Sequence, residues 1–218
     1  MDPSGSGFMK PADIDRIYRD MPQEKIPWNI EAPPDELVEI VTHDIIRPSR
    51  AVDLGCGAGN YAIYLASIGF DVTGIDSSPA AIKIAKENAE KKGVRCNFIV
   101  ADLLGDLHEV DGKFDFAYDW ELLHHIFPAD RTAYIDNVFS ILNPGALYLS
   151  VCFSEEDPQF GGVGKYRKTP LGTILYFSSE SEIEELFAPY FYIRDIKTKL
   201  IRGKYAPHCA VYVLSERR

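Results

Sequence analysis

The stretch "AVDLGCGAGNYAIYLA", residues 51–66, decides the fold of this chain. It joins a short apolar run to a helical one through glycines at alternate positions, Gly55, Gly57 and Gly59. Glycine adopts positive φ without strain and lets a ligand approach the backbone closely. Because Asp53 stands two residues before the first glycine, the stretch predicts a nucleotide-binding turn with a carboxylate beside it.

Around this turn, strand and helix patterns alternate. Strands are predicted at 50–54, 70–76, 94–102, 113–120 and 146–153, and helices at 60–69, 77–93, 130–142 and 178–190. Such alternation implies right-handed crossovers and a parallel sheet with helices on both faces. Asp130 is the expected N-cap of the third helix, and Ser178 or Ser179 that of the fourth.

The C-terminal part changes pattern, because strands at 191–201 and 208–217 follow each other with only the loop "RGKYAP" between them. They should therefore pair antiparallel. Segments 11–21 and 33–46 predict two extra helices before the first strand. The predicted fold class is α/β: a Rossmann-like, doubly wound, seven-stranded sheet, mostly parallel with an antiparallel C-terminal strand, plus extra N-terminal helices.

Length and composition predict one domain over residues 11–218, with residues 1–10 a disordered tail or a vector-derived remnant. The net charge of −10 argues against nucleic acid as the main partner. No apolar run reaches the length of a membrane span, and the N-terminus lacks a signal peptide. Four scattered cysteines, Cys56, Cys96, Cys152 and Cys209, form no CxxC motif, so reduced thiols in a cytoplasmic monomer or homodimer are expected.

The carboxylate beside the turn discriminates between two nucleotide classes. A dinucleotide fingerprint needs Gly or Ala where this chain has Asn60, and Asp53 would repel a pyrophosphate. S-adenosylmethionine has no phosphate and carries a cationic sulfonium and an ammonium. Unit charges ~4 Å apart interact by about 4 kcal/mol in a surface-like dielectric. The predicted cofactor is therefore S-adenosylmethionine.

The motifs from 48 to 152 resemble those of class I S-adenosylmethionine-dependent methyltransferases. "VDLGCGAGNYAIYLA" resembles motif I of that family, "VTGIDSSPAAIKIAKENA" and "FIVADLL" the next segments, and "KFDFAYDWELLHHI" the fourth-strand motif. The resemblance implies that Asp76 holds the ribose hydroxyls and that Asp102 faces the adenine amino group. The N-terminal "IPWNIEAPPDELVEIV" is similar to the thiopurine, thiol and halide methyltransferase-like branch, which implies that Trp28 lies near the cofactor.

The glycine turn and the family resemblance together give the predicted site residues. The cofactor-binding set is Trp28, Asp53, Gly55, Cys56, Gly57, Gly59, Asn60, Asp76, Ser77, Asp102, Leu103 and Asp119; the catalytic set is Asp119, Glu121 and His124. Plainer roles stay open: a helix cap for Asp76, a solvated turn for Asp102, a loop charge for Asp119 or Glu121, packing for His124 and His125, and a hydrophobic staple for Trp28. Neither cysteine nor histidine spacing suggests a metal site.

The chemistry expected of such a site is in-line methyl transfer, for which the protein mainly positions the acceptor and excludes water. A base is needed only where the acceptor carries a proton of high pKa. Residues 154–173 predict a lid, whose Lys165, Arg167 and Lys168 would meet an anionic acceptor or form a solvated loop. The acceptor cavity should be walled by the Trp28 region, by 120–127 and by this lid.

The resulting hypothesis is a small-molecule methyltransferase that uses S-adenosylmethionine and binds neither nucleic acid nor membrane. Three alternatives remain: a methyltransferase for RNA or protein, a non-catalytic S-adenosylmethionine-binding protein, and a dinucleotide-dependent reductase. Asp53 and Asn60 argue against the reductase. The intact motif favours cofactor binding but does not by itself establish turnover, because fold and motif do not fix function.

Overall fold

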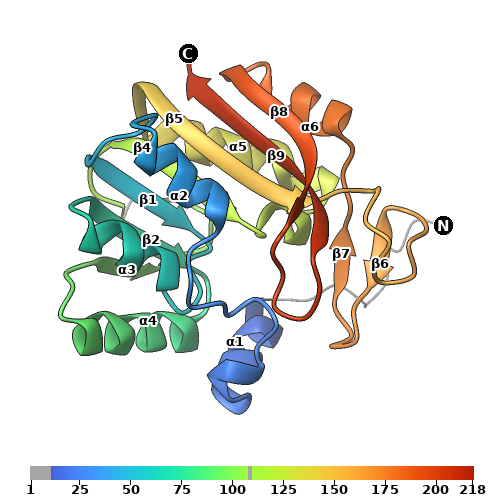
Figure 1. Cartoon of the computed structure of the whole chain (residues 1–218), viewed down its shortest axis with the longest axis horizontal. Helices are drawn as coiled ribbons and strands as arrows, with labels where there is room; N and C mark the ends of the chain where they lie inside the picture. The colour runs from blue at the N-terminus through green and yellow to red at the C-terminus, as the bar shows by residue number, and fades with distance from the viewer. Residues whose placement is uncertain (1–10, 108–109) are drawn as a thin grey trace.

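A computed structural model describes residues 11–107 and 110–218. Its main sheet has seven strands in the order β3-β2-β1-β4-β5-β9-β8 (Figure 1). The strands are β1 Arg50–Leu54, β2 Asp71–Asp76, β3 Asn97–Val100, β4 Phe114–Trp120, β5 Leu142–Phe153, β8 Phe191–Ile201 and β9 His208–Arg217. β1 to β5 pair in parallel, whereas β9 runs antiparallel to both β5 and β8. The predicted fold class is thus confirmed.

The helices follow the predicted order. They are α1 Pro11–Asp20, α2 Asp35–Thr42, α3 Asn60–Ser67, α4 Pro79–Lys92, α5 Pro128–Ile141 and α6 Glu180–Phe187. The N-cap prediction for Asp130 is wrong: α5 begins at Pro128 after Phe127, which places Asp130 in the first turn. Proline suits the first helical position because its φ is already helical and its missing N–H has no helical partner there. Ser179 caps α6 in a capping box with Glu182.

The sheet buries both faces. One core joins α2, α3 and α4 to side chains such as Ala51, Val72 and Tyr118. The other joins α5 and α6 to Val52, Leu54 and Tyr148. In Figure 1, α5 and α6 lie behind the sheet. Successive residues of β1 serve opposite faces because side chains alternate along a strand.

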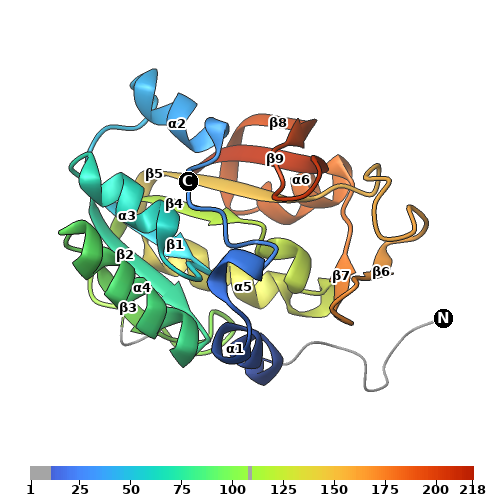
Figure 2. The same cartoon turned by 60° about the horizontal axis from the view of Figure 1, so that its bottom comes forward.

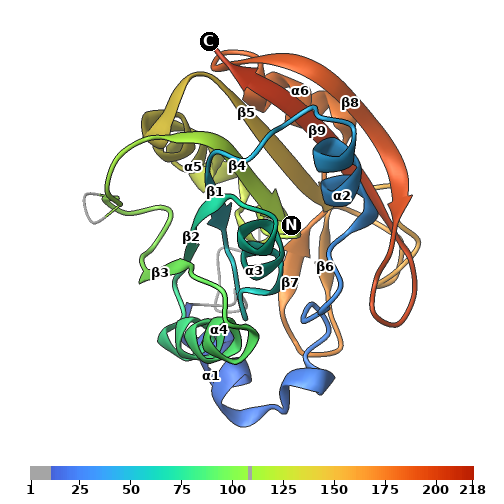
Figure 3. The same cartoon turned by 60° about the vertical axis from the view of Figure 1, so that its left-hand side comes forward.

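Two features lie outside these layers. Helix α1 packs beside α4 at the edge of the fold (Figures 2 and 3). The segment predicted as an irregular lid contains part of a second, two-stranded sheet of β6 Tyr166–Lys168 and β7 Ile174–Tyr176. Its short strands carried no periodic pattern long enough to predict them.

Residues 1–10, expected to be a tail, lie outside the described part. Within the described part, all four cysteines are free thiols. No helix in the described ranges has the length and apolar character needed to cross a membrane.

Candidate active site

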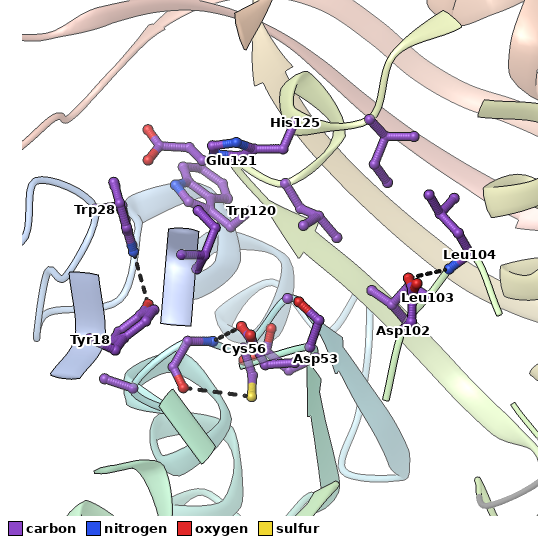
Figure 4. A pocket seen from close by; sticks show the side chains of 18 of the residues that line it. Tyr18, Trp28, Asp53, Cys56, Asp102, Leu103, Leu104, Trp120, Glu121 and His125 are labelled. Atoms are coloured by element: carbon purple, nitrogen blue, oxygen red, sulfur yellow. Dashed lines mark hydrogen bonds between the residues drawn. The ribbon is translucent and has the colours of Figure 1, made fainter. Parts of the chain in front are cut away.

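A cavity of about 650 Å³ opens at the carboxyl ends of β1, β2 and β4. This is the edge at which doubly wound sheets bind ligands. Figure 4 shows Asp102 and Leu103 at one side of it, and Trp28, Glu121 and His125 together at another. The cavity therefore has two sides. One is built from strand ends, where doubly wound sheets bind nucleotides, and the other from the N-terminal segment and the loop after β4.

The glycine turn adopts the backbone that its sequence predicts. Gly55 and Gly57 both have positive φ, 74° and 51°. The amides of Gly55 and Cys56 donate to the carbonyl of Ile75, at 2.8 and 3.0 Å, which ties the turn to β2. A Cβ on Gly57 would collide with the Tyr18 hydroxyl, which lies directly beside it. Glycine is required here both for conformation and for space.

Asp76 holds the turn from the neighbouring strand. One carboxylate oxygen accepts from the Gly57 amide at 2.9 Å, and the other accepts from the Ser78 amide at 2.8 Å. Ser78, and not Asp76, caps α4 with its side chain. Burial raises the pKa of Asp76, although these two backbone bonds oppose the rise. A buried carboxylate on the cavity wall is thus available to a polar ligand.

Asp53 lies in the cavity wall and is 3% exposed. Burial raises the pKa of Asp53 to about 7, and the Tyr118 side chain opposes that rise. A cationic ligand beside it would favour the ionised form. Asp102 also lines the cavity, and its carboxylate accepts from the Leu104 amide at 3.0 Å in a turn after β3.

The N-terminal segment covers the cavity and is held by three sets of hydrogen bonds. The Asn60 side chain donates to the Asn29 side chain at 2.7 Å and to the Ile30 carbonyl at 3.2 Å. Asp15 of α1 accepts from the Ser78 hydroxyl and the Ala80 amide at the start of α4. The Trp28 indole donates to the Tyr18 hydroxyl at 2.8 Å.

These contacts give Asn60 a role that the sequence reasoning missed. The motif suggested a ligand contact, but the side chain also anchors the segment that carries Trp28. Tyr18, Asn29 and Ile30 line the cavity without having been predicted individually. The signal for Tyr18 was only the amphipathic pattern of the helix at 11–21, which shows that this segment packs but not against what. Asn29 and Ile30 belong to the Trp28 region that was predicted to wall the acceptor cavity.

Glu121 occupies an unusual position directly after β4. Its φ is 62°, in the left-handed region that non-glycine residues rarely adopt. Its Oε1 is buried and has no hydrogen-bond partner among the described residues. Burial raises the pKa of Glu121 to about 7. The side chain lines the cavity together with His125, whose pKa burial lowers to about 4, so that its imidazole is neutral.

Three predicted site residues are not brought to the described cavity wall. Asp119 is fully buried, where it accepts hydrogen bonds from Tyr134, Tyr148 and Ser150. Its place in β4 points it into the core under α5. The other two also serve packing.

His124 is 3% exposed and stacks on Phe153 at 4.1 Å between ring centroids. Gly59 is the N-cap of α3, and a Cβ there would lie 2.8 Å from the ring of Phe98. No cluster of three or more His, Cys, Asp or Glu suited to a metal ion occurs in residues 11–107 and 110–218.

The expected lid contributes one described residue to the cavity, Tyr166. Lys165 instead pairs with Glu155 and Glu182. Arg167 is 3% exposed and donates to backbone carbonyls of its own loop, including that of Gly164 at 2.8 Å. Lys165 and Arg167 thus stabilise the loop. Neither they nor Lys168 line the described cavity, so the idea that these cations meet an anionic acceptor is not supported.

The remaining predicted residues form a set that fits S-adenosylmethionine. They all line the cavity: Trp28, Asp53, Gly55, Cys56, Gly57, Asn60, Asp76, Ser77, Asp102 and Leu103. The fit rests on the turn of Gly55 and Gly57, which lines the cavity without side chains, and on the desolvated carboxyl of Asp53, which would gain from a cationic ligand.

Comparisons with known proteins agree with this geometry. Residues 51–145 match a protein family described as a methyltransferase domain. The chain is 29% identical over 173 residues to 2-heptyl-1-hydroxyquinolin-4(1H)-one methyltransferase of Mycobacteroides abscessus, a match that covers 78% of this chain and 70% of that protein.

Two further proteins widen the comparison. A ubiquinone biosynthesis O-methyltransferase of Xanthomonas euvesicatoria pv. vesicatoria is 31% identical over 132 residues; the match covers 56% of this chain and about half, 54%, of that protein. A structure solved in a study of the conversion of a disulfide bond into a thioacetal group during echinomycin biosynthesis superposes with a TM-score of 0.80. It is 26% identical, and the match covers 95% of this chain and 93% of that one.

Proposed function

Since this chain is an S-adenosylmethionine-dependent methyltransferase, we propose that it methylates a small molecule by in-line displacement, with Glu121 as the base. The observation that carries the proposal is the desolvated, unpartnered carboxyl of Glu121 in the cavity wall. A carboxylate with a pKa of about 7 can take up a proton at neutral pH more readily than an ordinary glutamate.

The cofactor's place follows from the residues that fit it. Asp76 would bind the ribose hydroxyls, Asp102 would face the adenine, and Asp53 and the turn from Gly55 to Gly57 would face the charged amino-acid part. When bound, the cofactor supplies a methyl group on a positively charged sulfur, which is an electrophile. Trp28 and Tyr18 close the cavity from the N-terminal side.

The chain's own part in the reaction is to hold the acceptor and to manage its proton. Glu121 accepts the proton from the acceptor's nucleophilic atom, and neutral His125 orients the acceptor by a hydrogen bond. The covering segment excludes water, which keeps the Glu121 carboxyl desolvated. Holding the nucleophile in line supplies the greater part of the rate enhancement, because a base contributes typically 10²–10⁴-fold.

The size of the acceptor is inferred from the enclosure of the cavity. Three elements meet over it: the segment carrying Trp28, the loop after β4, and β6 through Tyr166. Two relatives are named for methylation of a hydroxyquinolone and for O-methylation in ubiquinone biosynthesis. These names favour an oxygen of a small aromatic compound over RNA or protein as the acceptor. Placement in the thiopurine, thiol and halide branch stays a prediction that rests on Trp28, Pro33 and Leu37.

The test is methyl transfer to 2-heptyl-1-hydroxyquinolin-4(1H)-one, followed as release of S-adenosylhomocysteine between about pH 5.5 and 9. We expect kcat to rise through about pH 7. Glu121→Gln should lower kcat about 10²–10⁴-fold while S-adenosylhomocysteine affinity is unchanged. Equal rates in both proteins would remove Glu121 from the reaction, and a folded protein that binds neither sulfur nucleoside would overturn the proposed cofactor site.

A further inference from the structure

Aromatic rings from three elements meet at the acceptor side of the cavity. Trp28 and His125 lie edge to face with centroids 6.4 Å apart. Phe127 and Tyr166 stack with centroids 5.7 Å apart and an interplanar angle of 18°. All four rings line the cavity. Flat apolar walls of this kind are suited to a flat aromatic ligand, which they contact by stacking or by edges.

The charges at the same side are negative. Glu121 and Asp130 line the cavity there, and Asp53, Asp76 and Asp102 line the cofactor side. No lysine or arginine occurs among the described residues that line the cavity. The N-terminus of α5 brings a partial positive charge, but Asp130 in its first turn offsets it.

Cations close to the cavity are already engaged by backbone carbonyls. Lys204 donates to the carbonyls of Ile26 and Asn29, at 2.8 and 3.0 Å. Arg131, 5% exposed, donates to the carbonyl of Ile126 at 2.9 Å. These groups hold the cavity walls together, so recruiting one of them to an anionic ligand would break existing bonds.

We infer that the methyl acceptor is a flat aromatic molecule that enters the site without a negative charge. The inference rests on the proposed function and names the substrate class for that site. An acceptor that arrived as an anion would face the Glu121 carboxylate in a desolvated cavity with no free cation among the described lining residues. A protonated acceptor avoids this repulsion and transfers its proton to Glu121 only after binding. Asp53 and Asp76 offset the positive charge that the cofactor brings, so the cofactor does not convert the cavity into an anion site.

Two probes of matched shape test the charge rule: 2-naphthol and 6-hydroxy-2-naphthoate. Both have the same flat ring system and a hydroxyl that stays protonated at about pH 8, where Glu121 is ionised. The protein is first saturated with S-adenosylhomocysteine, whose binding is measured by calorimetry. Each probe is then titrated into that complex. Failure of the nucleoside to bind counts against the cofactor site, and so is separated from a failure of the charge rule.

We expect 2-naphthol to bind at least about tenfold more tightly than 6-hydroxy-2-naphthoate, because like charges in a desolvated site repel strongly. Glu121→Gln should narrow this ratio by about threefold or more, since it removes the nearest charge. The control Glu185→Gln changes an exposed glutamate of α6 outside the described cavity lining and should leave the ratio unchanged. Tyr166→Ala should weaken 2-naphthol binding, whereas Tyr166→Phe should retain it.

Three results would overturn the inference. One is that the naphthoate binds as tightly as the naphthol or more tightly. Another is that the nucleoside complex binds no detectable 2-naphthol at millimolar concentration, because a flat neutral ring is then not what the cavity accepts. The third is that Glu121→Gln leaves the ratio of the two affinities unchanged, because the charge of Glu121 is then not what excludes an anion.

Discussion

The carboxylate of Asp76 holds the glycine turn and is also proposed to bind the ribose. The substitution Asp76→Asn should therefore lower both stability and nucleoside affinity, whereas substitution of an ordinary surface aspartate should lower neither. In the ligand-free protein the two oxygens accept from the amides of Gly57 and Ser78, and the residue is 8% exposed. Asparagine keeps the shape of the side chain but has one oxygen, so one of the two amides loses its acceptor. The same change removes an acceptor from the proposed ribose contact.

The size of the effect follows from those bonds. A hydrogen bond to a charged group contributes about 1.5–3 kcal/mol. Losing one bond should thus lower the free energy of unfolding by at most about that amount, or the melting temperature by at most about 3–12 °C for a chain of this size, because removing a buried charge recovers part of the loss. The loss of one ribose contact should weaken S-adenosylhomocysteine binding by about 10- to 150-fold.

The assay pairs urea unfolding with calorimetric titration of S-adenosylhomocysteine. The matched control is Asp71→Asn at the other end of the same strand, β2. Asp71 is 78% exposed and pairs with Arg50 at 3.5 Å, a contact of small energetic value. We expect the control to resemble the wild type in both measurements. A folded Asp76→Asn protein with wild-type stability and wild-type affinity would refute the reasoning.

Three other residues give further predictions. Burial raises the folded-state pKa of Asp53 from 3.8 to about 7, so its ionisation costs the folded protein stability as pH rises across that interval. Asp53→Asn should therefore gain stability relative to the ligand-free wild type between about pH 4 and 7, as urea unfolding at several pH values will measure; a difference constant with pH would contradict this. Gly57→Val should lose S-adenosylhomocysteine binding by calorimetry, whereas Gly145→Val, which has φ of 79° and an open space around its Cβ, should suffer the backbone strain and still bind. Asn60→Ala should loosen the covering segment, seen as faster tryptic cleavage after Lys25, and weaken nucleoside binding about tenfold through two lost hydrogen bonds; unchanged cleavage would show that this anchor is not needed.

Sequence patterns predicted the features that depend on local order along the chain. The glycine turn, Asp53 and Asp76 all follow strands that could be recognised from apolar runs, and parallel strands bring their carboxyl ends to one edge. The antiparallel pairing of the two final strands was equally readable, because only a short loop joins them. These predictions needed no knowledge of distant contacts.

The parts that could not be predicted depend on distant partners. Asn60 bonds to Asn29 and Ile30, which lie 30–31 positions earlier in the chain. Asp119 does not reach the described cavity wall for a reason that the strand pattern did contain: it follows Ala117 on the face that packs under α5. In a regular strand, Asp119 and Glu121 would share a face. The left-handed backbone at Glu121 breaks this alternation, and the sequence did not reveal that break.

That break is what gives Glu121 its significance. The left-handed backbone at φ of 62° costs of order 1 kcal/mol or more for a residue with a Cβ, and the buried Oε1 has no described partner to offset its desolvation. Neither cost is needed for packing. Glycine would adopt this backbone without strain, and an apolar side chain could be buried without leaving a polar atom unpartnered. A residue that bears both costs in the wall of a ligand cavity is better explained by what it does to a ligand. The neighbouring neutral His125 and the absence of a lining lysine or arginine among the described residues then indicate that the ligand's contribution is a proton and not a negative charge.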